Sequence, residues 1–372
     1  MKKTTVDFKK LFLCAAAVLI LSVMLMLTGC EDSFSSQPPM LQPPTPNAPA
    51  DPPESQPPMQ IVTPDPEQEI HFTDINLENI VRDKIGKSIG VITRADVEEI
   101  TVLSARVRGI TNIESLEYFT NLEELDLYGN RITDFSVLEK LTSLKKLNIA
   151  KNYNVVAGTS GGTGLDISYL KSLLLLEELD ASDNMLSDLT PISYLTALKT
   201  LILSRNRITD ITPLSACRSL TYLDLSYNYG INADNTERGI SDLSPVFTCA
   251  ELTSLIAGHN LITRVDGIEA LKELSYLDLT DNFVDSLESI AKIRKLDTLL
   301  LHSNGLISIE PLAGNKTIVT LDVSLNMISD FTPITSMPAL RTLVWEQNNI
   351  QDYTPIDEFE GRGDQTTANN GV

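Results

Sequence analysis

Two short patterns in the sequence could form the nucleophilic site of a hydrolase. Both read G-x-S-x-G, as GKSIG at residues 86–90 and as GTSGG at residues 158–162. A hydrolase uses this pattern to expose a serine between a strand and a helix, within reach of a histidine base. The first pattern follows an expected helix, and the second lies in a glycine-rich insert. We therefore interpret both as chance matches and expect no catalytic residue.

The three histidines of the chain give little support for metal chemistry. His259 and His302 are expected two strand spacings apart, roughly 10 Å, whereas the ligands of one metal each lie about 2 Å from it. The stretch NADNTERG at residues 232–239 offers oxygen ligands, but it matches no complete EF-hand loop. We favour a solvated loop there, with calcium as the alternative. The sequence thus predicts no cofactor, no metal site and no enzyme.

The charge of the chain argues against nucleic acid as a partner. The formal net charge is −21, and no run of Lys or Arg occurs after the first ten residues. Binding to nucleic acid needs clustered basic side chains that replace counterions. An acidic surface instead favours basic or neutral partners and keeps the chain soluble. We expect a soluble monomeric domain that binds a protein.

The N-terminus has the features of a secretory signal peptide. A basic start is followed by an apolar run at residues 11–27 and by Leu27-Thr28-Gly29-Cys30. This last stretch resembles the lipobox of bacterial lipoproteins, which implies removal of residues 1–29 and a lipid on Cys30. The alternative is an uncleaved membrane anchor, because 17 residues are the lower limit for a spanning helix. Both interpretations place the rest of the chain outside the cytoplasmic membrane, and the lipid would anchor it to the bacterial cell membrane.

Two segments precede the main part of the chain. Residues 30–69 hold the lipidated cysteine and a linker rich in proline, which cannot bury a core and is expected to be disordered and extended. Residues 70–99 have a helical apolar pattern that ends at Gly86, and Thr93 and Asp96 have the spacing of a capping box. We interpret residues 70–99 as a helical N-terminal cap.

Residues 100–356 consist of about eleven repeats, mostly of 22 residues, and His259 and His302 belong to this array. The intervals between repeats are 22 residues apart from two of 32. Such a period is typical of a leucine-rich repeat solenoid, in which each repeat packs only on its neighbours. The repeats begin at Ile100, Leu122, Leu144, Leu176, Leu198, Leu220, Leu252, Leu274, Leu296, Ile318 and Leu340.

Asparagine occupies the ninth position of every repeat except the first, where Arg108 stands. The chain turns sharply after each short strand, which leaves backbone donors and acceptors away from water. One Asn side chain offers both a donor and an acceptor, and an unpaired buried group costs about 1–3 kcal/mol. We therefore predict a structural ladder of Asn130, Asn152, Asn184, Asn206, Asn228, Asn260, Asn282, Asn304, Asn326 and Asn348.

The other repeat positions predict an α/β fold with a parallel β-sheet on a concave face and short 3-10 or loop segments on a convex face. Positions 3 to 8 are expected to form the strand, with positions 4 and 6 pointing inward. Proline recurs at position 16, where it excludes a long helix. Cys217 and Cys249 both fall at the apolar position 20. Two buried thiols are the favoured interpretation, and a disulfide is the alternative.

The concave face offers side chains that the fold does not need. At position 5, aliphatic residues alternate with carboxylates, and tyrosines and histidines lie nearby. Exposed apolar and aromatic groups ringed by polar ones are typical of protein interfaces, although β-forming residues also simply suit strands. The predicted partner-binding residues are Ile202, Tyr222, Asp224, Tyr227, Ile256, His259, Tyr276, Asp278, Leu300 and His302.

The repeat phrasing resembles the internalins of Gram-positive bacteria. It is carried by NRITDITPL and NMLSDLTPI, and FTDINLENIVRDKIG is similar to the cap that precedes internalin repeats. The resemblance covers about residues 70–356 and implies adhesion to a host surface protein or glycan through the concave face. The chain differs in lacking an L-P-x-T-G sorting signal. The alternative function is a cell-envelope scaffold for a bacterial partner.

The segment 357–372 is expected to be a polar C-terminal tail. It contains Arg362-Gly363-Asp364, a tripeptide that resembles the one recognised by integrins. Three common residues also arise together by chance. The sequence leaves both interpretations open.

Overall fold

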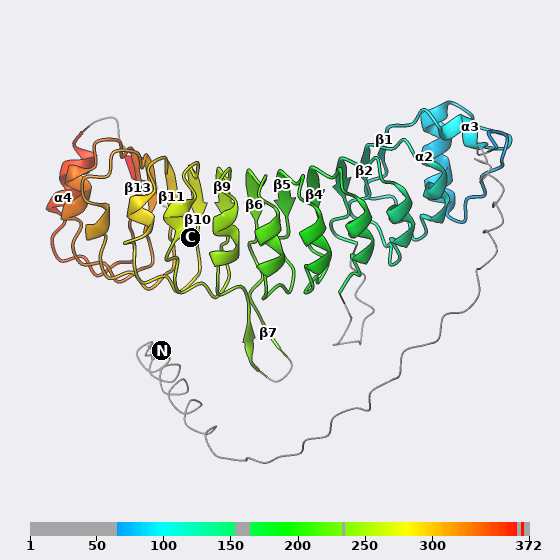
Figure 1. The fold of residues 1–372 in the computed structure, drawn as a ribbon. Helices are drawn as coiled ribbons and strands as arrows, with labels where there is room; N and C mark the ends of the chain where they lie inside the picture. Colours follow the sequence, from blue (N-terminus) through cyan, green and yellow to red (C-terminus); the bar gives the residue numbers. More distant parts are fainter. Residues whose placement is uncertain (1–64, 153–163, 233–234, 363–365, 368–372) are drawn as a thin grey trace, which may run out of the picture. The chain divides into compact units, whose positions relative to one another are not determined.

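The computed structural model describes residues 65–152, 164–232, 235–362 and 366–367. The signal peptide, Cys30, most of the linker, the GTSGG segment and the residues Gly363 and Asp364 lie outside the described residues. The chain divides into two units, and the second, Thr63–Val372, holds all of the described structure. Figure 1 shows this unit as a row of stacked repeats.

The cap consists of two helices whose ends follow from their flanking residues. Helix α2 (Ile75–Ile85) begins after Asp74, whose carboxylate accepts from the backbone N–H groups of Asn76 and Leu77, and it ends at Gly86 with φ +68°. Helix α3 (Arg94–Val97) begins after Thr93, whose backbone N–H donates to the carboxylate of Asp96 at 2.8 Å. Apolar side chains of both helices cover the first repeat, since Leu77, Val81 and Val97 are buried.

Each of the eleven repeats contributes one three-residue strand to a parallel sheet, and the two-residue β14 after the last repeat pairs with β13 as a twelfth strand. The twelve strands of this sheet within the described residues follow the order β1-β2-β3-β4-β5-β6-β9-β10-β11-β12-β13-β14. Their bounds are β1 (Val102–Ser104), β2 (Glu124–Asp126), β3 (Lys146–Asn148), β4 (Glu178–Asp180), β5 (Thr200–Ile202), β6 (Tyr222–Asp224), β9 (Ser254–Ile256), β10 (Tyr276–Asp278), β11 (Thr298–Leu300), β12 (Thr320–Asp322), β13 (Thr342–Val344) and β14 (Thr366–Thr367).

Short 3-10 helices form the opposite side of the stack. Five of them carry proline in their first turn, as at Pro191 and Pro213, where the fixed φ of proline suits a helical start. Their bounds are η1 (Glu114–Tyr118), η2 (Ser136–Lys140), η3 (Ser168–Ser172), η4 (Thr190–Tyr194), η5 (Thr212–Ala216), η6 (Ser244–Thr248), η7 (Ile268–Ala270), η8 (Ile290–Lys292), η9 (Glu310–Leu312) and η10 (Thr332–Ser336). This arrangement confirms the predicted leucine-rich repeat solenoid.

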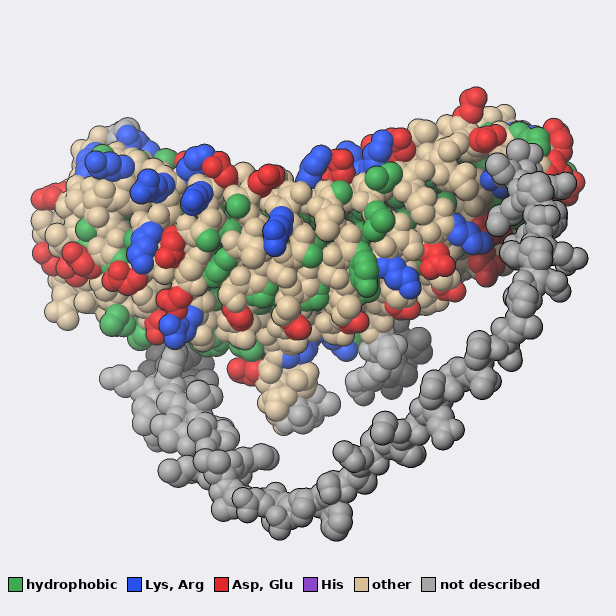
Figure 2. Space-filling view, viewed as in Figure 1, with side chains coloured by type: hydrophobic (Ala, Val, Ile, Leu, Met, Phe, Trp, Pro, Cys, Tyr) green, Lys and Arg blue, Asp and Glu red, His purple; other side chains and the backbone are tan. Residues whose placement is uncertain are grey.

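The core runs continuously between the sheet and the 3-10 helices. It is filled by the inward side chains of each repeat, which are almost all fully buried. Cys217 and Cys249 lie in this core as free thiols, and the Sγ of Cys249 donates to the carbonyl of Cys217 at 3.3 Å. Figure 2 shows that one exterior side has its hydrophobic side chains in small separate groups among polar atoms.

The strands are shorter than predicted, because the chain leaves the strand after position 5. At position 8 of every repeat the backbone takes a left-handed conformation, as at Arg205 (φ +57°) and Tyr227 (φ +57°). This turn delivers the following asparagine to the interior. Asn206 then accepts from the N–H groups of Asn184 and Leu186 and donates to the carbonyls of Ala181 and Leu203.

Two further segments differ from the expectations. The ten-residue insert of the sixth repeat forms a hairpin of β7 (Gly230–Ile231) and β8 (Glu237–Arg238), which extends away from the stack in Figure 1. At the other end, helix α4 (Thr354–Glu360) extends into the segment expected to be a polar tail. Its Phe359 is fully buried and covers the last repeat.

Candidate partner-binding site

The sheet presents two rows of outward side chains, which we call the sheet face. They are positions 3 and 5 of each repeat, because the side chain at position 4 points into the core. In β5, for example, Leu201 is fully buried while Thr200 and Ile202 are half-exposed. The sheet face corresponds to the concave face of the sequence analysis.

The pairing register aligns the position-5 side chains in one continuous row. Asp224 pairs with Ile256, and Ile256 pairs with Asp278. Aliphatic and acidic side chains therefore alternate across neighbouring strands at a spacing of about 4.8 Å. The same register places Ile202 between Asp180 and Asp224, and Leu300 between Asp278 and Asp322.

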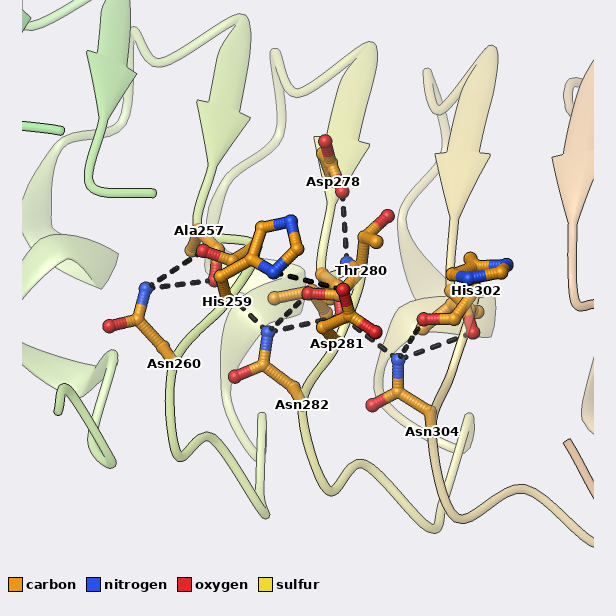
Figure 3. A network of polar contacts seen from close by, with 12 residues as sticks. Ala257, His259, Asn260, Asp278, Thr280, Asp281, Asn282, His302 and Asn304 are labelled. Carbon is orange, nitrogen blue, oxygen red and sulfur yellow. Dashed lines mark hydrogen bonds and ion pairs between the residues drawn. The ribbon is translucent and has the colours of Figure 1, made fainter. Parts of the chain in front are cut away.

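The aspartates of this row also stabilise the turn that follows each strand. The Oδ1 atom of Asp224 accepts from the backbone N–H of Ser226 at 2.9 Å and from its hydroxyl at 2.6 Å. Asp278 accepts in the same way from the N–H of Thr280 at 2.9 Å (Figure 3). One oxygen of Asp224 and one of Asp278 are thus committed to the turn.

Two tyrosines lie on the sheet face at position 3, with one small residue between them. Ser254 pairs with Tyr222 on one side and with Tyr276 on the other. Both tyrosines are half-exposed. Burial, followed by the charge of Asp224, raises the pKa of Tyr222, and burial followed by Asp278 and Tyr222 raises the pKa of Tyr276. Both hydroxyls therefore stay protonated and can donate hydrogen bonds to a ligand.

The other aromatic candidates lie in the turns and not on the strands. Tyr227 and His259 occupy position 8, and their rings stack with centroids 3.9 Å apart. The Nδ1 atom of His259 lies 2.9 Å from Asp281 (Figure 3). His302 occupies position 7, and its Nδ1 atom lies 2.7 Å from the hydroxyl of Ser324. The placement of these three residues on the strands was wrong, because each strand ends at position 5.

A hollow of the sheet face lies over β1 to β5, away from most of the predicted residues. Its volume is about 380 Å³. It shares only Ile202 with the predicted residues. The charged and amide side chains that line it are Glu124, Asp126, Lys146, Asn148, Glu178 and Asp180.

This hollow is acidic around one central lysine. The Nζ atom of Lys146 lies 3.2 Å from Glu178 and 3.9 Å from Glu124. Asp126 pairs with Arg106 at 2.7 Å, and Asp180 accepts from the amide of Asn148 at 3.2 Å. The signal for this site in the sequence is the set of charged residues at positions 3 and 5 of the second to fourth repeats, whereas the predicted residues all lie in the fifth to ninth repeats.

The described residues offer no arrangement typical of an active or metal site. GKSIG follows helix α2, with Gly86 as the C-cap of that helix, and so lacks the strand that a nucleophile elbow requires. No group of three His, Cys, Asp or Glu side chains in the described part of the chain could hold a metal ion. In that same part, no helix has both the length and the apolar character to cross a membrane.

The chain resembles known proteins both in sequence and in structure. A family model described as Leucine Rich repeats (2 copies) matches residues 120–157, 175–216 and 196–245. Internalin H of Listeria monocytogenes is 42% identical over 64 residues, which span 17% of this chain and 12% of that protein. The matched part is therefore a small fraction of that relative's length.

Two solved structures of internalins match most of the described repeats. One is an internalin of Listeria monocytogenes, which is 26% identical to this chain and superposes with a TM-score of 0.61. The match covers 84% of this chain and 100% of the internalin chain. The other is internalin C2 of the same species, which is 30% identical and superposes with a TM-score of 0.53. This match covers 67% of this chain and 99% of the internalin C2 chain. The identity to internalin C2, together with the coverage of nearly its whole chain, places this protein in the same family.

Proposed function

The chain belongs to the internalin-like family of leucine-rich repeat proteins, and on that premise we propose that it binds a protein partner through the sheet face. The partner is a surface protein of a host cell, and the complex serves adhesion. The chain acts by binding and carries out no reaction.

One observation carries this proposal, namely the group formed by Tyr222, Ile256 and Tyr276 on three neighbouring strands. These side chains are half-exposed, and the core is already complete behind them. Tyrosines beside an aliphatic residue and ringed by carboxylates have the composition of an interface hot spot. The fold gains little from them, so a partner is the better reason for their presence.

The acidic hollow over β1 to β5 extends the same face. Glu124, Glu178 and Asp180 outnumber the single Lys146. Opposite charges across an interface steer association and fix the register of a complex. The partner therefore carries a basic side chain opposite this hollow and an apolar or aromatic group opposite Tyr222 and Tyr276.

The site is held outside the cell by the N-terminal segment. Residues 1–29 are removed, Cys30 carries the lipid, and the proline-rich residues 31–69 separate the repeats from the membrane. Replacing Cys30 by Ala is expected to abolish incorporation of a labelled fatty acid into the chain. Absence of the label from the wild type, or equal labelling of the two proteins, would contradict a lipid on Cys30.

The partner is identified by affinity capture with the full chain as bait. Extracts of host-cell surface proteins and of bacterial envelopes are offered to the wild type and to a variant carrying Tyr222→Ala, Ile256→Asp and Tyr276→Ala. The matched control is Tyr194→Ala, which removes an exposed tyrosine from the opposite side, on η4. Thermal unfolding establishes that the variants are folded.

A host protein that binds the wild type and Tyr194→Ala but not the triple variant supports adhesion. A bacterial envelope protein with the same behaviour would replace adhesion with the scaffold function. Equal capture by all three proteins would show that the sheet face is not the binding surface.

A further inference from the structure

A second surface feature lies away from the sheet face, at the edge where the hairpin β7–β8 leaves the stack. It is a shallow pocket of about 360 Å³. Its lining is cationic and aromatic although the chain as a whole is strongly acidic. Its cationic and aromatic lining residues are Arg205, Arg207, Tyr227, Tyr229, Arg238 and His259.

One side of the pocket is built from the left-handed turns of successive repeats. The guanidinium of Arg205 lies over the ring of Tyr227, 4.3 Å from its centroid, and the other neighbour of Tyr227 is His259. His259 in turn contacts the carboxylate of Asp281 at 2.9 Å. This stack across adjacent repeats holds the Arg205 guanidinium in place without neutralising it.

The hairpin delivers a second guanidinium to the opposite side. Arg238 on β8 donates to the carbonyl of Asn228 at 3.1 Å and to that of Asn206 at 3.4 Å. The guanidinium packs closely on Gly230, because a Cβ there would lie 2.5 Å from Nη2 of Arg238 and would displace this side chain. The insert is thus shaped around this side chain.

The guanidinium groups of the pocket have no carboxylate partner among the described residues, although Asp281 contacts His259 and Glu237 lies 3.4 Å from the hydroxyl of Tyr229. Within the described residues, none of Arg205, Arg207 and Arg238 forms an ion pair, and Asp183, at position 8 of the preceding repeat, pairs with none of them. Burial, followed by the charge of Arg207, lowers the pKa of Arg238. Like charges that are brought together and partly desolvated favour a bound anion.

The ligand class follows from the donors and from the size of the pocket. Guanidinium groups match phosphate, sulfate and carboxylate oxygens with paired N–H donors. The pocket volume is at the lower end of the range for small-molecule sites. The pocket can therefore hold one residue of a longer ligand, such as one sugar of an oligosaccharide. Tyr229 adds an exposed ring beside the cations, with its hydroxyl 3.4 Å from Glu237.

We propose that this pocket binds an acidic saccharide, with the anionic group between Arg207 and Arg238 and the sugar ring against Tyr229. The site is separate from the sheet face. It requires neither the protein partner nor the lipid, so the two sites can be occupied at the same time.

The test uses the purified full chain and isothermal titration with defined probes. The probes are a sulfated heparin tetrasaccharide, its desulfated form, sialyllactose and inorganic sulfate. The variants are Arg207→Gln and Arg238→Gln, the second of which also removes the donor to the two carbonyls. The matched control is Arg218→Gln, which removes the same charge from an exposed position beside Cys217.

We expect saturable binding of the sulfated or the sialylated probe, and which of the two binds identifies the anionic group. Either pocket variant should weaken binding by about tenfold or more, whereas Arg218→Gln and the triple sheet-face variant should bind like the wild type. Absence of binding by every saccharide would overturn the proposal, as would an equal loss in Arg218→Gln. Inorganic sulfate binding as tightly as the saccharide would overturn the assignment of a sugar.

Unfolding temperatures of the variants separate loss of the site from loss of the fold. If Arg238→Gln unfolds early, Arg207→Gln decides the outcome, because no backbone group depends on its side chain in the described contacts. Loss of the protein partner with saccharide binding intact would contradict only the proposed adhesion.

Discussion

The carboxylate of Asp74 accepts a hydrogen bond from the backbone N–H of Thr111 at 2.8 Å and so joins the start of the cap helix α2 to the first repeat. Its other oxygen accepts from Asn76 and Leu77 at the first turn of α2. One side chain therefore begins the cap and attaches it to the solenoid.

Replacing Asp74 by Ala should destabilise the cap by about 2 kcal/mol, because a helix N-cap and a buried acceptor are lost together. Chemical denaturation monitored by circular dichroism measures this change. Asp83→Ala on the same helix is the control, since its side chain is exposed. Equal stability of the two variants would contradict the role of Asp74.

The same residue predicts how the stability depends on pH. Burial raises the pKa of Asp74, but the hydrogen bonds from Thr111 and Leu77 outweigh it, so the net pKa is lowered. Because the folded pKa lies below the unfolded value of about 3.9, the unfolded chain binds the proton first. The stabilisation is complete above that value and is lost as the pH falls through the folded pKa. The acid limb of the stability curve should be flatter in Asp74→Ala than in Asp83→Ala.

Replacing Asn206 by Ala should cost about 3 kcal/mol or more, because the buried N–H groups of Asn184 and Leu186 lose their acceptor. The carbonyls of Ala181 and Leu203 also lose one of their amide donors. Asn348→Ala, at the half-buried end of the array, should cost less. Urea titrations of both variants measure the difference. A larger loss at Asn348 would show that the ladder does not act through burial.

Replacing Lys146 by Ala should increase the affinity of the acidic hollow for a cationic probe such as pentalysine, because Glu124 and Glu178 lose their only shared counter-charge in the described contacts. The increase should fade as salt is added. Lys199→Ala removes an ion-paired lysine that does not line the hollow. Both variants should melt close to the wild type, because exposed ion pairs contribute little.

The two core thiols should resist alkylation in the folded protein. Burial, followed by the neighbouring Cys249, raises the pKa of Cys217 to about 12, and burial raises the pKa of Cys249. The reactive thiolate is therefore scarce at pH 8. Peptide mapping after iodoacetamide treatment should find both unmodified before unfolding and modified after it, while an introduced Thr196→Cys reacts at once. A mass lower by two hydrogens after unfolding would reveal a disulfide instead.

Replacing Phe359 by Ala should destabilise the C-terminal end by about 3–5 kcal/mol, since a fully buried aromatic side chain is removed. Hydrogen exchange is the suitable measurement, because it reports on each repeat separately. Increased exchange should be strongest in β13 and decline toward β10. Uniform exchange over the array would mean that the last repeats unfold together with the first.

The sequence predicted the solenoid because one period places the same residue type in the same environment many times. Leu201 and Leu223 occupy equivalent positions and pair in adjacent strands. The length of the strands was not predictable in this way. Each strand ends before the left-handed turn at position 8, and the residue type there varies from repeat to repeat, as at Arg205 and Tyr227. Gly129 is the only glycine at this position, so the sequence does not mark the turn.

The features outside the period were harder to predict. The acidic hollow depends on charges such as Glu124 and Lys146 that meet only when strands pair side by side. The pocket beside the hairpin depends on Arg238, which reaches Asn206 across 32 residues of sequence. Helix α4 is short and extends beyond residue 356, where the predicted repeats end. Its buried Phe359 lies past that boundary, so the repeat pattern did not show that this segment is helical.

The row of left-handed residues has a consequence for how such proteins diversify. An L-residue in this conformation costs about 1–2 kcal/mol, yet the row tolerates aliphatic, aromatic, acidic and basic side chains alike. The members are Val107, Gly129, Lys151, Asp183, Arg205, Tyr227, His259, Asp281, Ser303, Leu325 and Gln347. The backbone is held by the neighbouring asparagines and not by the identity of these residues. Mutations in this row can therefore accumulate and change what the surface recognises while every descendant keeps the same stack.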